Sequence, residues 1–319
     1  MLTSFETPDI DNKYLKNYPY VKRLVTGNYQ YQQVLENADY KTTLEQQIKT
    51  FVNEQKITKP LTERRNGIIK HITKILTNKF HNSKLTSFGS FESELSLALG
   101  DIDLCLEFDG EQPKKVLKKI ARMLNEDGMK DVKLIANAKV PIVKCVDNQS
   151  MIPIDISVNN NLSVYNTELL RRYNKLDSRV KPFILAIKYW ARNRGICEPT
   201  SGTFSSYAWT LIAINALQTM ENPVIPNILL KDGSNEVTIE GKKFDVSMSE
   251  LKDIKFNPQN QDTVSELIIK FFTNIATKWP WNDSVISVGN GKLLSRTKKQ
   301  WVHQKPFVNN AIQDKKIVR

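Results

Sequence analysis

Three aspartates stand where carboxylate groups can share a cation. Asp101 and Asp103 belong to the run 101–108, in which apolar residues alternate with the others as they do along a strand. Positions i and i+2 of a strand face the same side with Cα atoms about 7 Å apart, so the two carboxylates converge and repel each other. A hard cation such as Mg²⁺ between them removes the repulsion. The alternative is a pair of solvent-facing acids on an edge strand.

The third aspartate, Asp155, lies in a second alternating run. In residues 151–158 the isoleucines face one side and Asp155 faces the other. Pro153 cannot donate to a sheet ladder, so it marks the start of a strand or a bulge. A lone acid in such a strand is by itself an ordinary edge residue. It becomes evidence for a metal site only together with Asp101, Asp103 and the glycine–serine pair described next.

A glycine–serine pair precedes the first two carboxylates. Ser90 stands eleven residues before Asp101, and the run 91–99 between them has helical spacing. Gly89 permits close approach of the backbone, and Ser90 can cap a helix whose free N–H groups bind phosphate. Such a turn is common alone. In this order, however, the motifs describe two-metal nucleotidyl transfer with Mg²⁺ or Mn²⁺, which works by positioning and charge stabilisation and needs no histidine base.

The surrounding pattern predicts the elements that hold these motifs. Residues 1–55 read as a polar, partly helical segment that packs on the body, residues 56–160 as an α+β half, and residues 161–319 as a mainly helical half with a loop-rich stretch near 231–260. Besides the two aspartate strands, we expect strands at 132–134 and 140–146, and helices at 61–80, 114–124, 169–176, 180–194, 205–220 and 263–277.

Composition narrows the class of protein and its partners. The 319 residues carry a formal charge of +12, and residues 289–319 hold eight basic side chains against one acid, which favours a polyanionic partner. Three scattered cysteines form no CxxC pair, which argues against a zinc site or a disulfide framework. Acids at the N-terminus and the lack of a long apolar run predict a soluble intracellular protein without a membrane partner. The cytoplasm is favoured over the nucleus, because the paired lysines are short for a nuclear signal.

The motifs resemble a known superfamily. The run FGSFESELSLALGDIDLCLEF, followed by IPIDISVNN, resembles the catalytic domain of DNA-polymerase-β-type nucleotidyltransferases. The runs PFILAIKYWARNRGI and SGTFSSYAWTLIAINAL are similar to the helical domain of noncanonical poly(A) polymerases and terminal uridylyltransferases. The resemblance implies an α+β fold: a polymerase-β-like nucleotidyltransferase domain at 56–160 with a mixed sheet, a mainly helical poly(A)-polymerase-associated domain at 161–319, and an active site in the cleft between them.

The resemblance also implies roles for the residues around the metals. Asp101, Asp103 and Asp155 would bind the metal ions, with Asp155 nearest the incoming 3′-hydroxyl group. Gly89 and Ser90 would hold the nucleotide triphosphate through backbone and hydroxyl groups. These expectations match the chemistry that the residue types and their order already favour.

The helical half carries the other implied contacts with phosphate. Lys188 and Arg192 lie one helical turn apart and would both reach the phosphates. The family usually has Lys where this chain has Arg192, which keeps the charge and changes the geometry. The alternative for this pair is a solvated basic face. Ser206 would also touch the phosphates.

Two further residues would recognise the nucleoside. Asn166 would read the ribose 2′-hydroxyl group, unless it is an ordinary residue at a helix start. Tyr207 would stack on the base, which tolerates any base because each presents a π face. The alternative for Tyr207 is a core aromatic residue.

Base choice depends in this family on a C-terminal loop that departs from the pattern here. The family loop reads Asp-Pro-Phe-Glu, followed in many uridylyl enzymes by His, whereas this chain has Lys305, Val308 and Ala311 at those three positions. The groups that would read uracil are therefore missing, and the small Ala311 leaves room for a purine. We expect ATP to be preferred. The alternative for Lys305 is a contact with RNA or phosphate.

These observations favour an RNA 3′-terminal nucleotidyltransferase that adds AMP from ATP. The alternatives are a uridylyltransferase that uses UTP, a 2′-5′ oligoadenylate synthetase, against which the helical-half motifs argue, and a catalytically inactive relative that binds RNA as a scaffold. No RNA-recognition motif, KH domain or zinc knuckle is visible. Contact with the RNA 3′ end must then come from basic surface, and a protein partner that chooses targets is not identified by the sequence.

Overall fold

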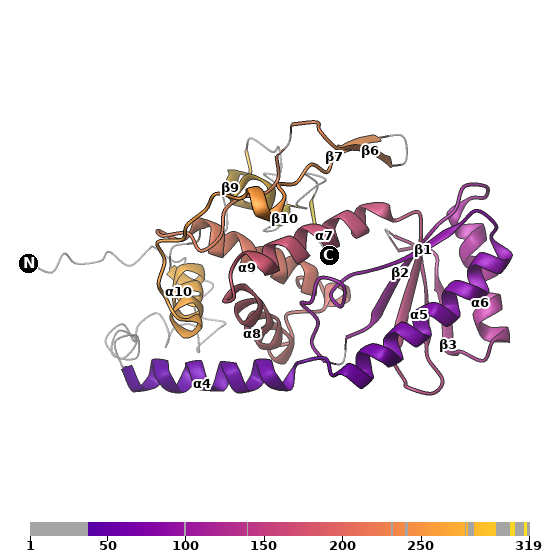
Figure 1. The fold of residues 1–319 in the computed structure, drawn as a ribbon, viewed down its shortest axis with the longest axis horizontal. Helices are drawn as coiled ribbons and strands as arrows, with labels where there is room; N and C mark the ends of the chain where they lie inside the picture. The colour runs from indigo at the N-terminus through magenta and orange to yellow at the C-terminus, as the bar shows by residue number, and fades with distance from the viewer. Residues whose placement is uncertain are drawn as a thin grey trace, which may run out of the picture.

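A computed structural model describes residues 38–98, 100–138, 140–230, 232–239, 242–277, 279, 284–297, 307–309 and 316–317. Within these residues the apolar side chains form two cores, one against a five-stranded sheet and one among helices. Figure 1 shows the sheet with α5 and α6 at one end of the molecule and α8, α9 and α10 at the other, with α7 between them. The two ends correspond to the two halves of the chain.

The first core belongs to a mixed sheet. Its strand order is β1-β2-β5-β4-β3, with β2 and β5 parallel and the other neighbours antiparallel. The elements run α5 (Lys59–Lys79), β1 (Lys84–Phe88), β2 (Ile102–Glu107), α6 (Pro113–Glu126), β3 (Lys130–Ile135), β4 (Ile142–Val146) and β5 (Pro153–Val158). Pro153 begins β5, as predicted for a residue that cannot donate to the ladder.

Apolar and other side chains alternate along β2, so they point to opposite faces of this sheet. Ile102, Leu104 and Leu106 are at most 1% exposed and pack with apolar residues of α5 and α6, which cover one face. Asp103 points to the other face because successive side chains of a strand alternate. Cys105 shares that second face and is also buried, since α7 packs there against β1 and β2.

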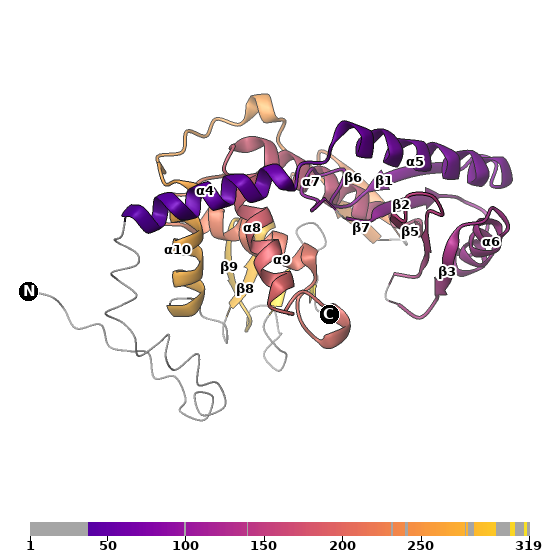
Figure 2. The ribbon, with the colours of Figure 1, turned by 90° about the horizontal axis from the view of Figure 1, so that it is seen from below.

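The second core is helical. Helix α9 is buried at eleven of its fourteen positions, so it runs through the centre of this half. Helix α4 packs along α8 and α10, an arrangement that Figures 1 and 2 both show. The helices are α4 (Ala38–Glu54), α7 (Asn161–Leu176), α8 (Val180–Asn193), α9 (Ser206–Thr219) and α10 (Val264–Thr277). The rest of the predicted N-terminal segment, residues 1–37, lies outside the described residues.

The second half also contains short strands that the sequence pattern did not predict. A hairpin lies inside the loop-rich stretch, and a small sheet has the order β11-β10-β8-β9. The strands are β6 (Glu236–Ile239), β7 (Lys242–Asp245), β8 (Ser284–Ser287), β9 (Lys292–Ser295), β10 (Phe307–Asn309) and β11 (Lys316–Ile317), and the 3₁₀ turns are η1 (Pro199–Ser201), η2 (Leu251–Asp253) and η3 (Val288–Asn290). Runs of two to four residues are too short to show a period. Among the residues described, no helix combines the length and apolarity needed to cross a membrane.

The helix predicted over residues 91–99 is wrong. Residues 91–94 and 98 form turns, with Glu94 in the left-handed region at φ 61°. A helix would leave the Leu95 carbonyl to an amide four residues later, but here it accepts a hydrogen bond from the Lys188 ammonium group at 2.6 Å. A tertiary contact has replaced the helical one, so no helix N-terminus follows Ser90, and the phosphate-binding role of Gly89 and Ser90 stays a prediction.

Candidate active site

The three predicted aspartates come together on one face of the sheet. Asp103 and Asp155 are direct neighbours in the parallel ladder of β2 and β5, and Asp101 immediately precedes β2. One carboxylate oxygen from each lies within 4.8 Å of the others, and all three residues are half-buried. Adjacent strands therefore deliver the convergence that the i, i+2 spacing predicted.

The electrostatics of this cluster fit a bound cation. Burial first, and then the charges of Asp101 and Asp155, raise the pKa of the Asp103 carboxyl group to about 8. Burial also raises the pKa of Asp155, against the hydrogen bond and charge of Lys144. Carboxylates that resist ionisation together are stabilised by a divalent ion, and an all-oxygen donor set suits Mg²⁺ or Mn²⁺. The residues present thus fit the metal ions that the sequence implied.

Lys144 on β4 is a member of the site that sequence reasoning missed. Its Nζ lies 2.5 Å from Asp155 Oδ2, and the two residues are paired across the β4–β5 ladder. The lysine side chain is 47% exposed and the aspartate side chain 16% exposed. The pairing register, which sequence alone did not provide, would have been needed to find it.

Arg65 on α5 is a second missed residue. It is 1% exposed, and its guanidinium group donates to the backbone carbonyls of Gly100 and Asp101, the latter at 3.0 Å, while lying 4.7 Å from the centre of the Phe91 ring. Burial is the main cause that lowers its pKa, and the charges of nearby aspartates oppose this. A signal was available, because Arg65 occupies the apolar face of α5 three residues before Ile68.

Gly89 approaches Asp103 too closely for any side chain. Its φ is +86°, and a Cβ atom placed on it would lie 2.0 Å from Asp103 Oδ2. Its N–H donates to Thr167 Oγ1 at 2.8 Å, so this amide is already bonded to α7. Ser90 remains in the same turn, and its carbonyl accepts from the Leu95 N–H at 2.9 Å. Sequence reasoning missed Thr167, a residue with no distinguishing local pattern.

The structure separates the two basic residues of α8. Lys188 is 5% exposed and bonded to Leu95, which brings it to the segment after Gly89–Ser90. Burial lowers its pKa to about 8, and the charge of Arg192 adds to this. Arg192 itself is exposed one turn later. Lys188 is therefore no part of a solvated basic face, whereas Arg192 is on the surface.

Two nucleoside-reading candidates carry buried polar atoms without a hydrogen-bond partner in the described structure. These atoms are Asn166 Oδ1 and the Tyr207 hydroxyl oxygen. Asn166 is only 7% exposed. Burial raises the pKa of Tyr207. Buried polar groups without partners are rare and mark places where a ligand or water bonds. Asn166 lies five residues into α7, so it is no helix-start residue, and Ser206 begins α9 beside its capping residue Ser205.

Two of the three proposed base-selectivity residues lie outside the residues that the structure describes. Lys305 and Ala311 lie outside the described residues. The backbone of Val308 belongs to β10, where it pairs with Ile286 and Ile317. The predicted preference for ATP stays a prediction.

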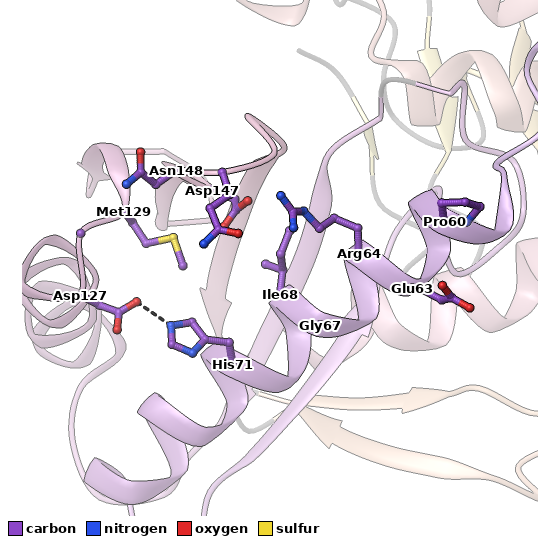
Figure 3. A pocket seen from close by; sticks show the side chains of 12 residues that line it. Pro60, Glu63, Arg64, Gly67, Ile68, His71, Asp127, Met129, Asp147 and Asn148 are labelled. Atoms are coloured by element: carbon purple, nitrogen blue, oxygen red, sulfur yellow. Dashed lines mark hydrogen bonds and ion pairs between the residues drawn. The ribbon is translucent and has the colours of Figure 1, made fainter.

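A separate cavity of about 640 Å³ lies beside α5 and is lined by none of the predicted site residues. Figure 3 shows the Arg64 side chain pointing toward Asp147, and His71 bonded to Asp127 at 2.8 Å. The residues that line this cavity include acids, bases and amides, and none of their buried side-chain polar atoms lacks a hydrogen-bond partner.

Comparison with known proteins agrees with this geometry. Residues 44–175 match the central palm domain of the mitochondrial-like poly(A) RNA polymerases. Poly(A) RNA polymerase cid11 of Schizosaccharomyces pombe is 32% identical over 254 residues, covering 78% of this chain and 51% of that protein. Terminal uridylyltransferase cid1 of the same organism is 30% identical over 270 residues, covering 82% and 66%. The MgGTP-bound Cid1 poly(U) polymerase structure has a TM-score of 0.77 at 29% identity over 85% of each chain.

The mixed sheet with its aspartates on adjacent strands is thus a polymerase-β-like nucleotidyltransferase fold, which confirms the predicted fold class. The chain belongs to the family of noncanonical poly(A) polymerases and terminal uridylyltransferases. It spans about half the length of the cid11 protein and 43% of the cid13 protein. The relatives include both adenylyl and uridylyl enzymes, so they leave the nucleotide undecided.

Proposed function

We propose that this protein is a template-independent RNA 3′-terminal nucleotidyltransferase. It transfers a nucleoside monophosphate from a nucleoside triphosphate to an RNA 3′ end and releases pyrophosphate. The observation that carries the proposal is the three-carboxylate cluster, whose oxygens lie within 4.8 Å of one another on strands paired in register. The catalytic part comprises residues 56–160, and residues 161–319 complete the cleft.

The side chains of this cluster divide the work. When bound, two Mg²⁺ or Mn²⁺ ions supply the charge that lowers the pKa of the 3′-hydroxyl group and balances the triphosphate. Asp101, Asp103 and Asp155 would hold those ions, and Asp155 would be the carboxylate nearest the 3′-hydroxyl group. The 3′-hydroxyl group gives up its proton to solvent, its oxygen forms a bond to the α-phosphorus, the bond from that phosphorus to the bridging oxygen breaks, and pyrophosphate leaves with that electron pair.

The nucleotide is held from the helical half. Lys188 reaches the Gly89–Leu95 segment, where Gly89, whose own N–H is bonded to Thr167, permits close approach of the triphosphate to the backbone. Ser90 offers its hydroxyl group to the triphosphate, and Lys188, Ser206 and Arg192 are further phosphate contacts. The unpartnered Asn166 Oδ1 accepts from the ribose, and the half-buried Tyr207 ring stacks on the base. Structures of Cid1 with its short product ApU and with the UTP analogue UMPNPP support RNA and nucleotide as substrates here.

ATP is the nucleotide we favour. Lys305, Val308 and Ala311 replace the polar residues that would read uracil, and poly(A) polymerases stand among the relatives at 32% identity. The second candidate is UTP, which the fold similarity to Cid1, a uridylyl enzyme, supports. The net charge of +12 favours contact with RNA through its phosphates, with salt-dependent affinity.

The test is extension of a labelled single-stranded RNA in Mg²⁺ or Mn²⁺, with ATP, UTP, CTP and GTP in separate reactions. Extension chiefly with ATP supports both the reaction and the base assignment. Extension chiefly with UTP keeps the reaction and overturns the base assignment. No extension with any nucleotide in either metal overturns the proposed activity for this chain on its own.

A further inference from the structure

One row of side chains crosses the sheet through the active site. Lys133 on β3 pairs with Lys144 on β4, Lys144 pairs with Asp155 on β5, and Asp155 pairs with Asp103 on β2. Directly opposite residues of neighbouring strands point to the same face. The carboxylates that face the cleft are therefore followed, strand by strand, by two lysines on the same face.

The nearer lysine is bonded to a carboxylate of the metal cluster. Lys144 Nζ lies 2.5 Å from Asp155 Oδ2, while that residue also offers an oxygen to the group shared with Asp101 and Asp103. A Mg²⁺ ion binds carboxylate oxygen at about 2.0–2.1 Å, so an ion held by Asp155 would lie close to the ammonium group bonded to the same carboxylate. Two cations that close repel each other strongly where water is partly excluded. Lys144 approaches Asp155 from the β4 side and Asp103 lies on the β2 side, so the ammonium group and a metal ion compete for the negative charge of the same carboxylate.

We propose that Lys144 is a resident cation on Asp155 in the substrate-free protein, and that its charge opposes the binding of a divalent ion there. The proposal rests on the proposed function, because it takes Asp155 as a metal ligand. While it is in place, the ammonium group holds the Asp155 side chain beside Asp103 and offsets the repulsion among the carboxylates. It also weakens metal binding to the empty site. Loading is then favoured when a nucleotide triphosphate supplies further oxygen ligands.

The test measures metal binding and does not depend on catalysis. Free Mn²⁺ is followed by electron paramagnetic resonance during titration of the nucleotide-free protein at pH 8.5, where carboxylates are largely ionised. The proteins are the wild type, Lys144→Met, Lys144→Arg and Lys133→Met. Lys133→Met is the matched control, because it removes the same charge from the same face one strand farther away.

We expect Lys144→Met to bind Mn²⁺ at least about fivefold more tightly than the wild type, and Lys133→Met to change affinity by less than about twofold. Lys144→Arg should stay near the wild type, since it keeps the charge. Structural damage would weaken binding, which is the opposite direction. Unchanged or weaker binding by Lys144→Met, or an equal gain in Lys133→Met, overturns the proposal while leaving the metal site intact. Failure of every protein to bind Mn²⁺, with and without ATP, overturns the metal assignment itself.

Discussion

Replacement of Gly89 by alanine tests how closely the turn before the cluster is fitted to the catalytic carboxylate. A Cβ atom at this position lies 2.0 Å from Asp103 Oδ2, whereas real Cβ contacts stay beyond 3.0 Å, so the carboxylate must move. The shift needed is about 1 Å, and a misplacement of that size in an active site costs about 10²-fold in rate. In addition, φ of +86° costs an alanine about 1–2 kcal/mol of folding free energy.

Gly128→Ala is the matched control. Gly128 has nearly the same φ, +85°, but an added Cβ atom would meet nothing within 4 Å. Both variants should therefore lose about 1–2 kcal/mol of unfolding free energy in urea titrations. Only Gly89→Ala should lose RNA extension, by about 10²-fold. If folded Gly89→Ala extends RNA within about threefold of Gly128→Ala, the contact between Gly89 and Asp103 has no part in catalysis.

Three further predictions follow from the same site. Asp103 has a folded-state pKa of about 8, above the ordinary value of 3.8, so the metal-free folded protein binds more protons than the unfolded chain between these pH values. Its contribution to the free energy of unfolding is therefore lost as pH rises from about 4 to about 8. The melting temperature of the metal-free wild type should fall over this pH range, and this fall should be smaller in Asp103→Asn. An equal fall in both proteins would contradict the raised pKa of Asp103. Arg65→Met should lower the free energy of unfolding by about 3 kcal/mol and should also lower the rate of RNA extension. Arg64 is exposed, so Arg64→Met should change the free energy of unfolding by less than about 0.5 kcal/mol. Similar losses in the two variants would refute the role of the contacts between Arg65 and the backbone carbonyls. Tyr207→Ala should weaken nucleotide binding by about 1–3 kcal/mol, measured as KM, while Tyr207→Phe keeps the stacking ring and stays near the wild type; a KM for Tyr207→Ala equal to the wild type would exclude stacking.

The elements that the sequence predicted well are those whose apolar residues repeat regularly over several residues. The alternation in residues 101–108 and 151–158 predicted β2 and β5, and the phase of Asp103 and Asp155 predicted that their carboxylates would share a face. The bounds predicted for α8, α9 and α10 are within one residue of those observed, whereas only residues 169–176 of α7 were predicted, so its first two turns were missed. These signals are local, so a single sequence contains them.

The parts that were missed depend on contacts between distant residues. The run 91–99 has helical spacing, but Lys188 takes the Leu95 carbonyl that a helix would use. Lys144 joins the cluster only through the pairing of β4 with β5, and Thr167 only through the packing of α7 on β1. No local pattern encodes strand register or helix packing, and these decide which side chains surround the aspartates.

The central claim is that Asp103 serves RNA 3′ extension as a metal-binding carboxylate. The most direct measurement compares extension of a labelled single-stranded RNA by the wild type, Asp103→Ala and Asp109→Ala in Mg²⁺ and ATP, with unfolding curves to show that each protein is folded. Asp109 is an exposed acid two residues beyond β2, which makes it the control for loss of a nearby charge. We predict extension by the wild type and Asp109→Ala and none by Asp103→Ala. Full extension by Asp103→Ala would contradict the two-metal assignment.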